Sequence, residues 1–276
     1  MSKPSTIFMG SKPGAAVALN ILVKRGWRIP YVVVTRDDYQ PWTSGPSLRD
    51  IAMSHSLRVV IQKDLPRGEP VDFVISYMYR NLVKADVLAL ARRAALNFHC
   101  APLPEYGGFG CYNRAILDEA REFGATCHYM DEGFDTGALL RVRRFPIVAE
   151  KETALSLERR AQEEMVRLFS EFCALAESGA PLPRQVQDKS QQRYLTEREL
   201  ADLKRIPDGA DAETIDRYAR AFWFPPYEGA HMVVGGCRVE VMPQQPKAEL
   251  AALLHQADHA RLTEVAQEDT PSRAAG

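Results

Sequence analysis

Asn97 and His99 are the residues of this chain whose types and spacing most clearly suggest chemistry. They lie two positions apart in the apolar run Leu-Asn-Phe-His-Cys-Ala, which reads as a strand. Because alternate side chains of a strand leave the same face, both would point to one side of a sheet. An amide donor beside an imidazole suits a reaction in which a carbonyl oxygen gains negative charge while a nucleophile loses a proton.

A carboxylate for this pair is offered by Asp135, in the turn-like sequence Phe-Asp-Thr-Gly. Aimed back at the imidazole, it would orient the His99 ring and stabilise its protonated form. The structural alternative makes Asn97 and His99 capping residues at a strand end and Asp135 an ordinary turn former.

Cys100 is adjacent to His99 and suggests a second chemistry, because a thiol beside an imidazole is a known catalytic pairing. Neighbouring side chains of a strand point to opposite faces, so we expect Cys100 to face away from His99. The five cysteines have no paired metal spacing, so we expect reduced thiols and no metal in the site.

At these residues the chain resembles the formyltransferase family that uses 10-formyltetrahydrofolate. Members share Asn-x-His near a Leu-Pro loop and His-x(6)-Asp-x-Gly further on. The matching positions here are Asn97, His99, Leu103, Pro104, Gly108, Thr126, His128, Asp135 and Gly137. The order and spacing of the whole set are specific, whereas Asn-x-His alone would mean little. The loop departs from many relatives, because it has Gly107-Gly108 where they carry an Arg-Gly pair, and this bears on the acceptor.

Apolar runs and helical patterns alternate along the part of the chain that would position these residues. Strands are expected over 6–10, 29–34, 58–61, 71–77, 125–130 and 139–147. Helices are expected over 15–24, 48–55, 84–92, 110–123 and 152–177. Together with the resemblance, this alternation predicts an α/β fold with a Rossmann-like, mostly parallel sheet over a catalytic domain of residues 1–185.

The remainder of the chain has a different composition. Two short helices, an aromatic run from 221 to 230 and a hairpin signalled by Gly235-Gly236 form a small region over 186–245. The aromatic run and hairpin resemble the C-terminal portion of bacterial sugar N-formyltransferases rather than the barrel of the methionyl-tRNA branch. Residues 246–276 are expected to form a helix and a disordered tail, with a dimer contact as the alternative.

The resemblance also implies where the substrates bind. In the family, the loop after the strand 71–77 and the loop at 131–135 hold the pterin ring, so the folate-side candidates are Met78, Tyr79, Asp131, Gly133 and Asp135. Core packing is the alternative for the first two.

Aromatic residues are the candidates on the acceptor side, because a base ring is readily held by stacking. They are Trp42, Tyr106, Trp223 and Tyr227. Trp42 lies in a long polar loop, where stapling that loop to the core is the alternative, and Phe222 is expected to pack in the core.

The composition of the chain argues against some classes of binding partner. The formal charge is −1, with 46% hydrophobic and 26% charged residues, which argues against nucleic acid or a membrane surface as a partner. No apolar run is long enough to span a bilayer, and no signal-peptide pattern opens the chain, so the cytoplasm is the expected compartment. A homodimer is expected.

The sequence therefore predicts an enzyme that moves a formyl group from 10-formyltetrahydrofolate to the amine of a nucleotide-linked amino sugar. The expected acceptor is a dTDP- or GDP-linked 4-amino-4,6-dideoxy or 3-amino-3,6-dideoxy sugar used in surface polysaccharides such as lipopolysaccharide O-antigen. One alternative is a related formyltransferase acting on hydroxyornithine, glycinamide ribonucleotide or methionyl-tRNA. The other is a nucleotide- or folate-binding protein without catalysis, which would not need Asn97, His99 and Asp135 together.

Overall fold

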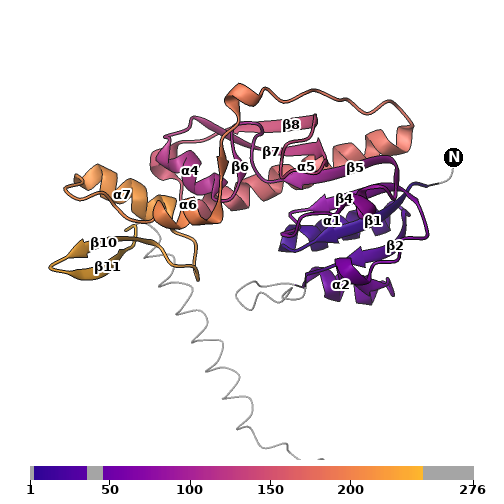
Figure 1. The fold of residues 1–276 in the computed structure, drawn as a ribbon, viewed down its shortest axis with the longest axis horizontal. Helices are drawn as coiled ribbons and strands as arrows, with labels where there is room; N and C mark the ends of the chain where they lie inside the picture. Colours follow the sequence, from indigo (N-terminus) through magenta and orange to yellow (C-terminus); the bar gives the residue numbers. More distant parts are fainter. Residues whose placement is uncertain (1–2, 36–45, 245–276) are drawn as a thin grey trace, which may run out of the picture.

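The computed structural model of the protein describes residues 3–35 and 46–244 (Figure 1). In chain order the strands are β1 Ser5–Gly10, β2 Arg28–Val33, β3 Val59–Val60, β4 Val71–Tyr77, β5 Ala91–His99, β6 Gly107–Gly108, β7 Glu122–Tyr129, β8 Leu139–Pro146, β9 Tyr194–Leu195, β10 Ala230–Val234 and β11 Cys237–Val241. The α-helices are α1 Pro13–Lys24, α2 Leu48–Ser54, α3 Ala85–Leu88, α4 Cys111–Leu117, α5 Ala154–Ser178, α6 Glu197–Asp202 and α7 Ala212–Ala221.

A seven-stranded sheet in the order β3-β2-β1-β4-β5-β7-β8 is the centre of the fold. The first five strands of that order run parallel, and β7 and β8 continue the sheet antiparallel. The predicted α/β fold with a mostly parallel sheet is therefore confirmed. Strand β5 of this sheet lies between its parallel neighbour β4 and its antiparallel neighbour β7. The Asn-x-His motif at the end of β5 is therefore close to the ends of both neighbouring strands.

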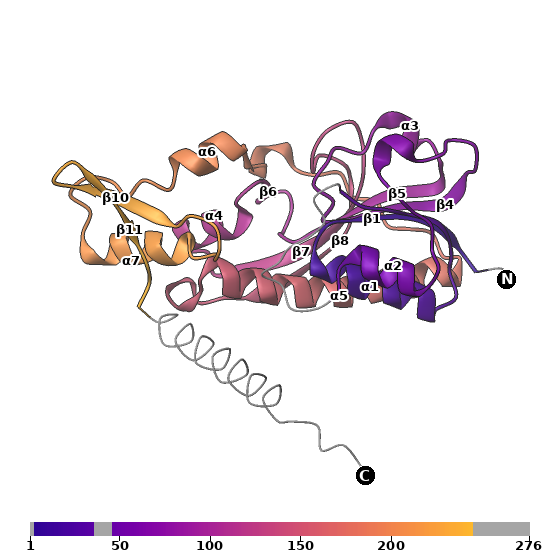
Figure 2. The same cartoon turned by 90° about the horizontal axis from the view of Figure 1, so that it is seen from below.

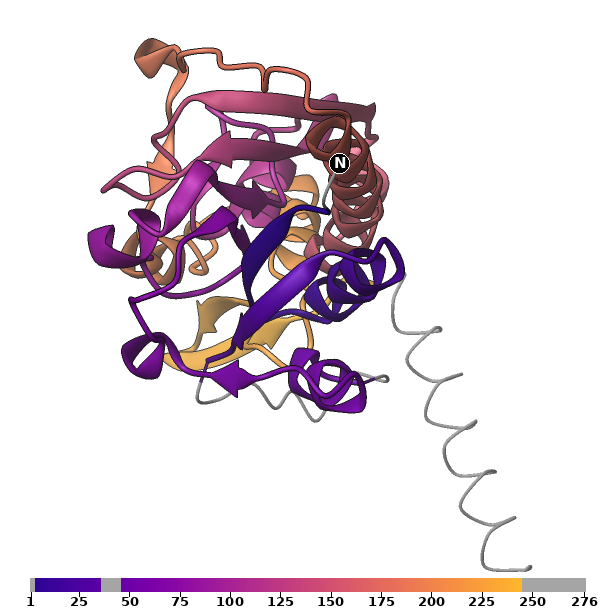
Figure 3. The same ribbon diagram turned by 90° about the vertical axis from the view of Figure 1, so that its right-hand side faces the viewer.

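The larger hydrophobic core lies between this sheet and the helices α1 and α5, which cover the same face (Figures 2 and 3). From β5 the side chains of Leu96 and Phe98 enter this core, where Phe98 packs against Phe169 of α5 with ring centroids 4.9 Å apart. Because side chains alternate along a strand, Asn97 and His99 leave the opposite face. The packing of α5 thus decides which face carries the motif.

Two expected helices are shorter than their sequence patterns. The helix expected over 84–92 ends as α3 at Leu88, and the residues from Ala91 onward belong to β5. The helix expected over 110–123 ends as α4 at Leu117, and β7 begins at Glu122. In both places residues of good helix propensity belong to a strand of the large sheet: Ala91 pairs with Val71 of β4, and Glu122 and Phe123 pair with β8. This pairing outweighs the local preference.

The elements after α5 gather at one end of the molecule (Figure 1). The hairpin of β10 and β11 is present as predicted, with positive φ angles of 57° and 81° at Gly235 and Gly236 that suit a two-residue turn. The short β9 pairs with β6, so the segment around Tyr194 is hydrogen-bonded to the expected catalytic domain. The division at residue 185 remains a prediction, and residues 246–276 lie outside the described residues.

Within the described ranges, no helix has both the length and the apolar character needed to cross a membrane.

Candidate active site

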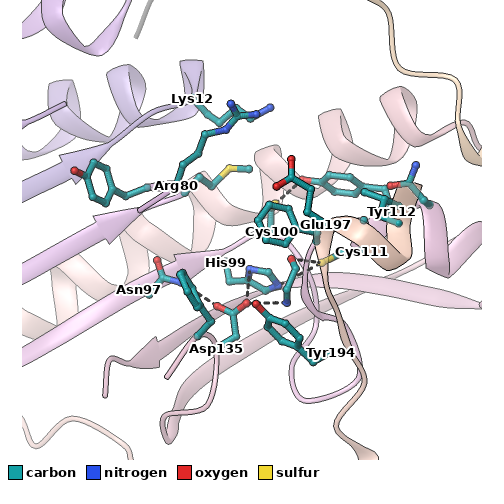
Figure 4. A pocket seen from close by; sticks show the side chains of 18 of the residues that line it. Lys12, Arg80, Asn97, His99, Cys100, Cys111, Tyr112, Asp135, Tyr194 and Glu197 are labelled. Atoms are coloured by element: carbon teal, nitrogen blue, oxygen red, sulfur yellow. Dashed lines mark hydrogen bonds and ion pairs between the residues drawn. The ribbon is translucent and has the colours of Figure 1, made fainter. Parts of the chain in front are cut away.

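Asn97, His99 and Asp135 meet at one point in space (Figure 4). The first two come from the end of β5, and Asp135 comes from the loop between β7 and β8. The Nδ1 atom of His99 lies 3.7 Å from Asp135 Oδ2, and Asn97 Nδ2 lies 3.4 Å from Asp135 Oδ1. All three border a cleft of about 720 Å³. The structure thus brings together the three residues that the sequence pattern proposes as one unit.

The tautomer of His99 follows from its partners. Its Nε2 lies 2.8 Å from the backbone oxygen of Tyr106, an acceptor only, so Nε2 carries the hydrogen. In the neutral ring the Nδ1 lone pair is then left on the side of Asp135. His99 is therefore arranged to take up a proton at Nδ1, with a carboxylate beside the charge that forms.

Asn97 is oriented by a buried network. Its Oδ1 accepts a hydrogen bond of 2.7 Å from the Ser76 hydroxyl, and its Nδ2 donates over 3.0 Å to Nε2 of His128. His128 in turn donates from Nδ1 to the Tyr129 carbonyl, at 2.8 Å. Only the longer contact of Nδ2, to Asp135, is weak. One amide N–H of Asn97 is thus available to an oxygen in the cleft at little cost.

Glycines permit the close approach on which the Asp135 loop depends. Gly108 has a φ of 78° and donates its backbone N–H to Asp135 Oδ2 over 3.0 Å. At Gly137 a Cβ atom would collide with the Tyr129 carbonyl oxygen. Both positions of the family motif therefore require glycine for a steric reason that the structure supplies.

The Asp135 carboxyl stays ionised although it is only 9% exposed. Burial alone would raise its pKa, but the neighbouring imidazoles of His99 and His128 and the Gly108 N–H together hold the pKa of Asp135 well below its usual range. A fixed negative charge therefore faces His99 throughout the neutral range.

This lowered pKa predicts how stability depends on pH. A group whose pKa is lower in the folded state stabilises the fold above its unfolded pKa, and that contribution is lost as the pH falls.

Asp135→Asn removes the charge with a residue that also tolerates positive φ. We expect it to lower the free energy of unfolding at pH 7 by about 1–3 kcal/mol. Below the ordinary pKa of 3.8 the gap to the wild type should narrow, by up to about 1.4 kcal/mol per pH unit. Urea unfolding between pH 7 and pH 3 measures this, and a gap that stays constant contradicts it.

The cysteines near the site are thiols. The Cys100 sulfur accepts a hydrogen bond from the Tyr112 hydroxyl, and burial raises the pKa of Cys100 to about 12. Cys111, for which no catalytic role was considered, lies near the imidazole, with Sγ 3.7 Å from His99 Nε2. Burial also raises the pKa of Cys111 well above its ordinary value. Neither sulfur is a thiolate nucleophile.

All five residues expected on the folate side border the cleft: Met78, Tyr79, Asp131, Gly133 and Asp135. The backbone of Met78 has a φ of 50° directly after β4, and the Asp131 carboxylate accepts hydrogen bonds from Gly133 N and Thr136 Oγ1. The side chains of Leu82, Val83, Met130 and Phe134 add apolar surface to this part of the lining.

Of the residues expected on the acceptor side, only some border the cleft. Tyr227 borders the cleft and is 43% exposed, whereas Trp223 is half-buried and is not part of the lining. The ring of Tyr106 packs against Phe123 outside the cleft, and only its carbonyl reaches the site. Trp42 lies outside the described residues. Phe222 is buried in the core, as expected.

Phe224 is an aromatic residue of the lining, beside Tyr227, that the sequence did not single out. Its ring lies 5.7 Å from that of Tyr227, and Lys12 Nζ lies 5.4 Å from its centroid. Lys12 also forms an ion pair of 3.3 Å with Glu158 of α5. A run of four aromatic positions signals a surface of this kind, but the sequence alone does not show which ring faces the cleft.

Residues 55–172 match the formyl transferase family. A methionyl-tRNA formyltransferase of Anaeromyxobacter dehalogenans is 30% identical over 262 residues, which cover 88% of this chain and 80% of the relative. With the sheet and the residues just described, these matches show that the chain belongs to the formyl transferase family, as the motif predicts.

Two further similarities concern sugar-modifying members. A GDP-perosamine N-formyltransferase of Brucella melitensis is 36% identical over 166 residues, 60% of this chain and 62% of the relative, so less than two thirds of that relative is spanned. The solved structure of an N-formyltransferase from Helicobacter canadensis, in complex with folinic acid and dTDP-3-aminofucose, superposes with a TM-score of 0.71. It is 20% identical and 85% of each chain is covered, a likeness that shows the fold.

Proposed function

We propose that this protein transfers a formyl group from 10-formyltetrahydrofolate to the primary amine of a sugar linked to a nucleoside diphosphate. The observation that carries the proposal is one continuous cleft. It contains the Asn97, His99 and Asp135 unit and is also bordered by the aromatic residues Phe224 and Tyr227. The test is incubation of the purified protein with 10-formyltetrahydrofolate and a panel of nucleotide-linked amino sugars, followed by mass spectrometry of the nucleotide sugars.

The lining suits a folate. A pterin is a flat ring with a polar edge, and the loops at 78–83 and 130–135 contribute both apolar and polar residues to the lining. Met78, Tyr79 and the residues around Gly133 would hold the ring. When bound, 10-formyltetrahydrofolate supplies an electrophilic formyl carbon.

The residues of the chain then handle the proton and the charge. His99 Nδ1 takes a proton from the attacking amine, and the imidazolium is stabilised by the ionised Asp135 and by the Tyr106 carbonyl. The Asn97 amide turns from its weak contact with Asp135 to an oxygen that gains negative charge. As the bond between the formyl carbon and the folate nitrogen breaks, the imidazolium can give its proton from Nδ1 to that departing nitrogen.

Phe224 and Tyr227 are proposed to hold the nucleotide, with Phe224 in the role expected of Trp223. Stacking of a base on an aromatic side chain contributes about 1–3 kcal/mol. Phe224→Ala should therefore raise the KM for the nucleotide sugar by about tenfold or more while leaving the KM for the folate unchanged.

Trp223→Ala is the matched control, because that ring does not border the cleft. Steady-state kinetics of the two variants show which aromatic ring contributes to binding of the nucleotide sugar. A larger effect at Trp223 than at Phe224 on the KM for the nucleotide sugar would remove Phe224 from the acceptor site.

Methionyl-tRNA is a second candidate acceptor, favoured by the coverage of 88% with the relative from Anaeromyxobacter. Residues 186–245, however, contain more acidic than basic side chains. Two cleft lysines are also already paired, Lys12 with Glu158 and Lys204 with Glu228. A tRNA acceptor normally requires a surplus of cations for its phosphates. Parallel formylation assays with methionyl-tRNA and with the panel of nucleotide sugars show which of the two candidate acceptors the protein uses.

The setting of this activity is also a proposal. All five cysteines are free, which suits a reducing compartment such as the cytoplasm. The exposed Val233, Val234 and Val239 of the hairpin offer an apolar surface for a homodimer. Formylated amino sugars would then serve surface polysaccharides such as O-antigen.

A further inference from the structure

Asp135 is held in a backbone conformation that aspartate adopts infrequently. Its φ is 56°, in the left-handed region, and the carboxylate direction depends on that angle. At Gly137 the loop is fixed by its close approach to Tyr129. The Gly108 N–H holds the side chain of Asp135 but not its backbone. Neither contact restrains the Asp135 peptide itself.

Gln187 provides that restraint from a distant part of the sequence. The segment after α5 returns along β8, where Gln185 and Leu139 exchange backbone hydrogen bonds of 2.9 and 2.7 Å. Two residues later the Gln187 side chain turns inward and is only 7% exposed. Its Nε2 donates to the carbonyl of Asp135 over 2.8 Å and to that of Gly137 over 2.7 Å.

The orientation of this amide is settled by its acceptors. Two carbonyl oxygens can be satisfied only by the two hydrogens of the Gln187 NH₂ group, because the amide oxygen has none to donate. Its Oε1 has no hydrogen-bond partner among the described residues. The amide is thus committed to the Asp135 loop.

We propose that Gln187 is a positioning residue of the active site, which directs the Asp135 carboxylate at His99 by fixing the backbone on both sides of Thr136. The inference rests on the proposed function for its kinetic consequence. Gln187 does not border the cleft, so it acts through Asp135 and not on a substrate.

The main test compares Gln187→Met with Gln185→Ala. Methionine keeps the length of the side chain but has no donor, whereas Gln185 is exposed and its bridge uses backbone atoms only. A small misplacement of a catalytic group can cost about 100-fold, so we expect kcat of Gln187→Met to fall about 10- to 100-fold. The KM for the nucleotide sugar should stay within about twofold, and Gln185→Ala should match the wild type.

Hydrogen–deuterium exchange without substrates gives a second readout. In Gln187→Met the peptide covering 131–138 should exchange about tenfold faster or more, while β4 keeps its wild-type rate. Unchanged exchange in the loop overturns the proposal, and so does faster exchange throughout the protein, which would show a purely structural role. If wild type and Gln185→Ala formylate no sugar, the proposed function fails, and the exchange comparison still decides the role of Gln187.

Gln187→Glu tests the donor itself and replaces the methionine variant if that protein does not fold. An ionised carboxylate cannot donate to the two carbonyls, but its protonated form offers one O–H. The kcat of this variant, as a ratio to wild type at each pH, should rise as the pH is lowered. A ratio that is independent of pH overturns the proposal.

Discussion

His99→Ala should lower kcat of formyl transfer by about 100-fold or more, since removing a general acid or base usually costs 10²–10⁴-fold. Asp135→Ala should cost nearly as much, because its carboxylate faces the same nitrogen at 3.7 Å. The double variant should be little worse than His99→Ala alone, because residues that act as one unit have strongly non-additive effects. Single-turnover rates with saturating substrates measure all three.

Cys100→Ser is the control for these variants. The Cys100 thiol remains protonated and bonded to Tyr112, so this substitution should leave kcat within about threefold of wild type. Wild-type turnover in folded His99→Ala would contradict the assignment of the proton to His99. Additive losses in the double variant would show that His99 and Asp135 act separately.

Asn97→Ala is expected to have an effect of similar size through a different step. Loss of one hydrogen-bond donor to a developing oxyanion costs about 10²–10³-fold in kcat. Asn97 also links Ser76 to His128, so the alanine variant leaves both partners unpaired. Ser76→Ala is therefore the companion variant: it frees the Asn97 amide oxygen without removing the donor.

The kinetic signature of the Asn97 variant separates catalysis from folding. We expect kcat to fall with the KM values of both substrates little changed, and Ser76→Ala to lose about tenfold or less. Equal losses in Asn97→Ala and Ser76→Ala would indicate that orientation of the network, and not the Asn97 donor, accounts for the rate.

Strand alternation explains why it was predictable that Asn97 and His99 lie together. Asn97 and His99 share a face on any strand, and Leu96 and Phe98 had to enter the core. The turn sequence around Asp135 and the glycines of the motif add the third member. The hairpin could also be predicted from the sequence, because Gly235 and Gly236 meet a local requirement for positive φ.

Other features depend on contacts that carry no local signal. Residues from Ala91 onward favour a helix by composition, yet they form strand β5, which pairs with β4 from Ala91 and with β7 from Leu96. Gln187 binds backbone carbonyls that lie 50 and 52 residues away in the sequence. Because every residue has a backbone carbonyl, the sequence does not show which carbonyls Gln187 binds. In the aromatic run, the side chain facing the cleft is set by how α7 ends, which placed Phe224 in the lining and left Trp223 out of it.

The most direct measurement is the mass of the nucleotide sugar after incubation with the protein and 10-formyltetrahydrofolate. We expect at least one dTDP- or GDP-linked amino sugar to gain the mass of one CO unit at its amine. We expect His99→Ala, at the same concentration, to form little of this product. No gain on any amino sugar, with formylation of methionyl-tRNA by the same preparation, would contradict the proposed acceptor. Formylation of the sugar by His99→Ala at the wild-type rate would contradict the proposed chemistry.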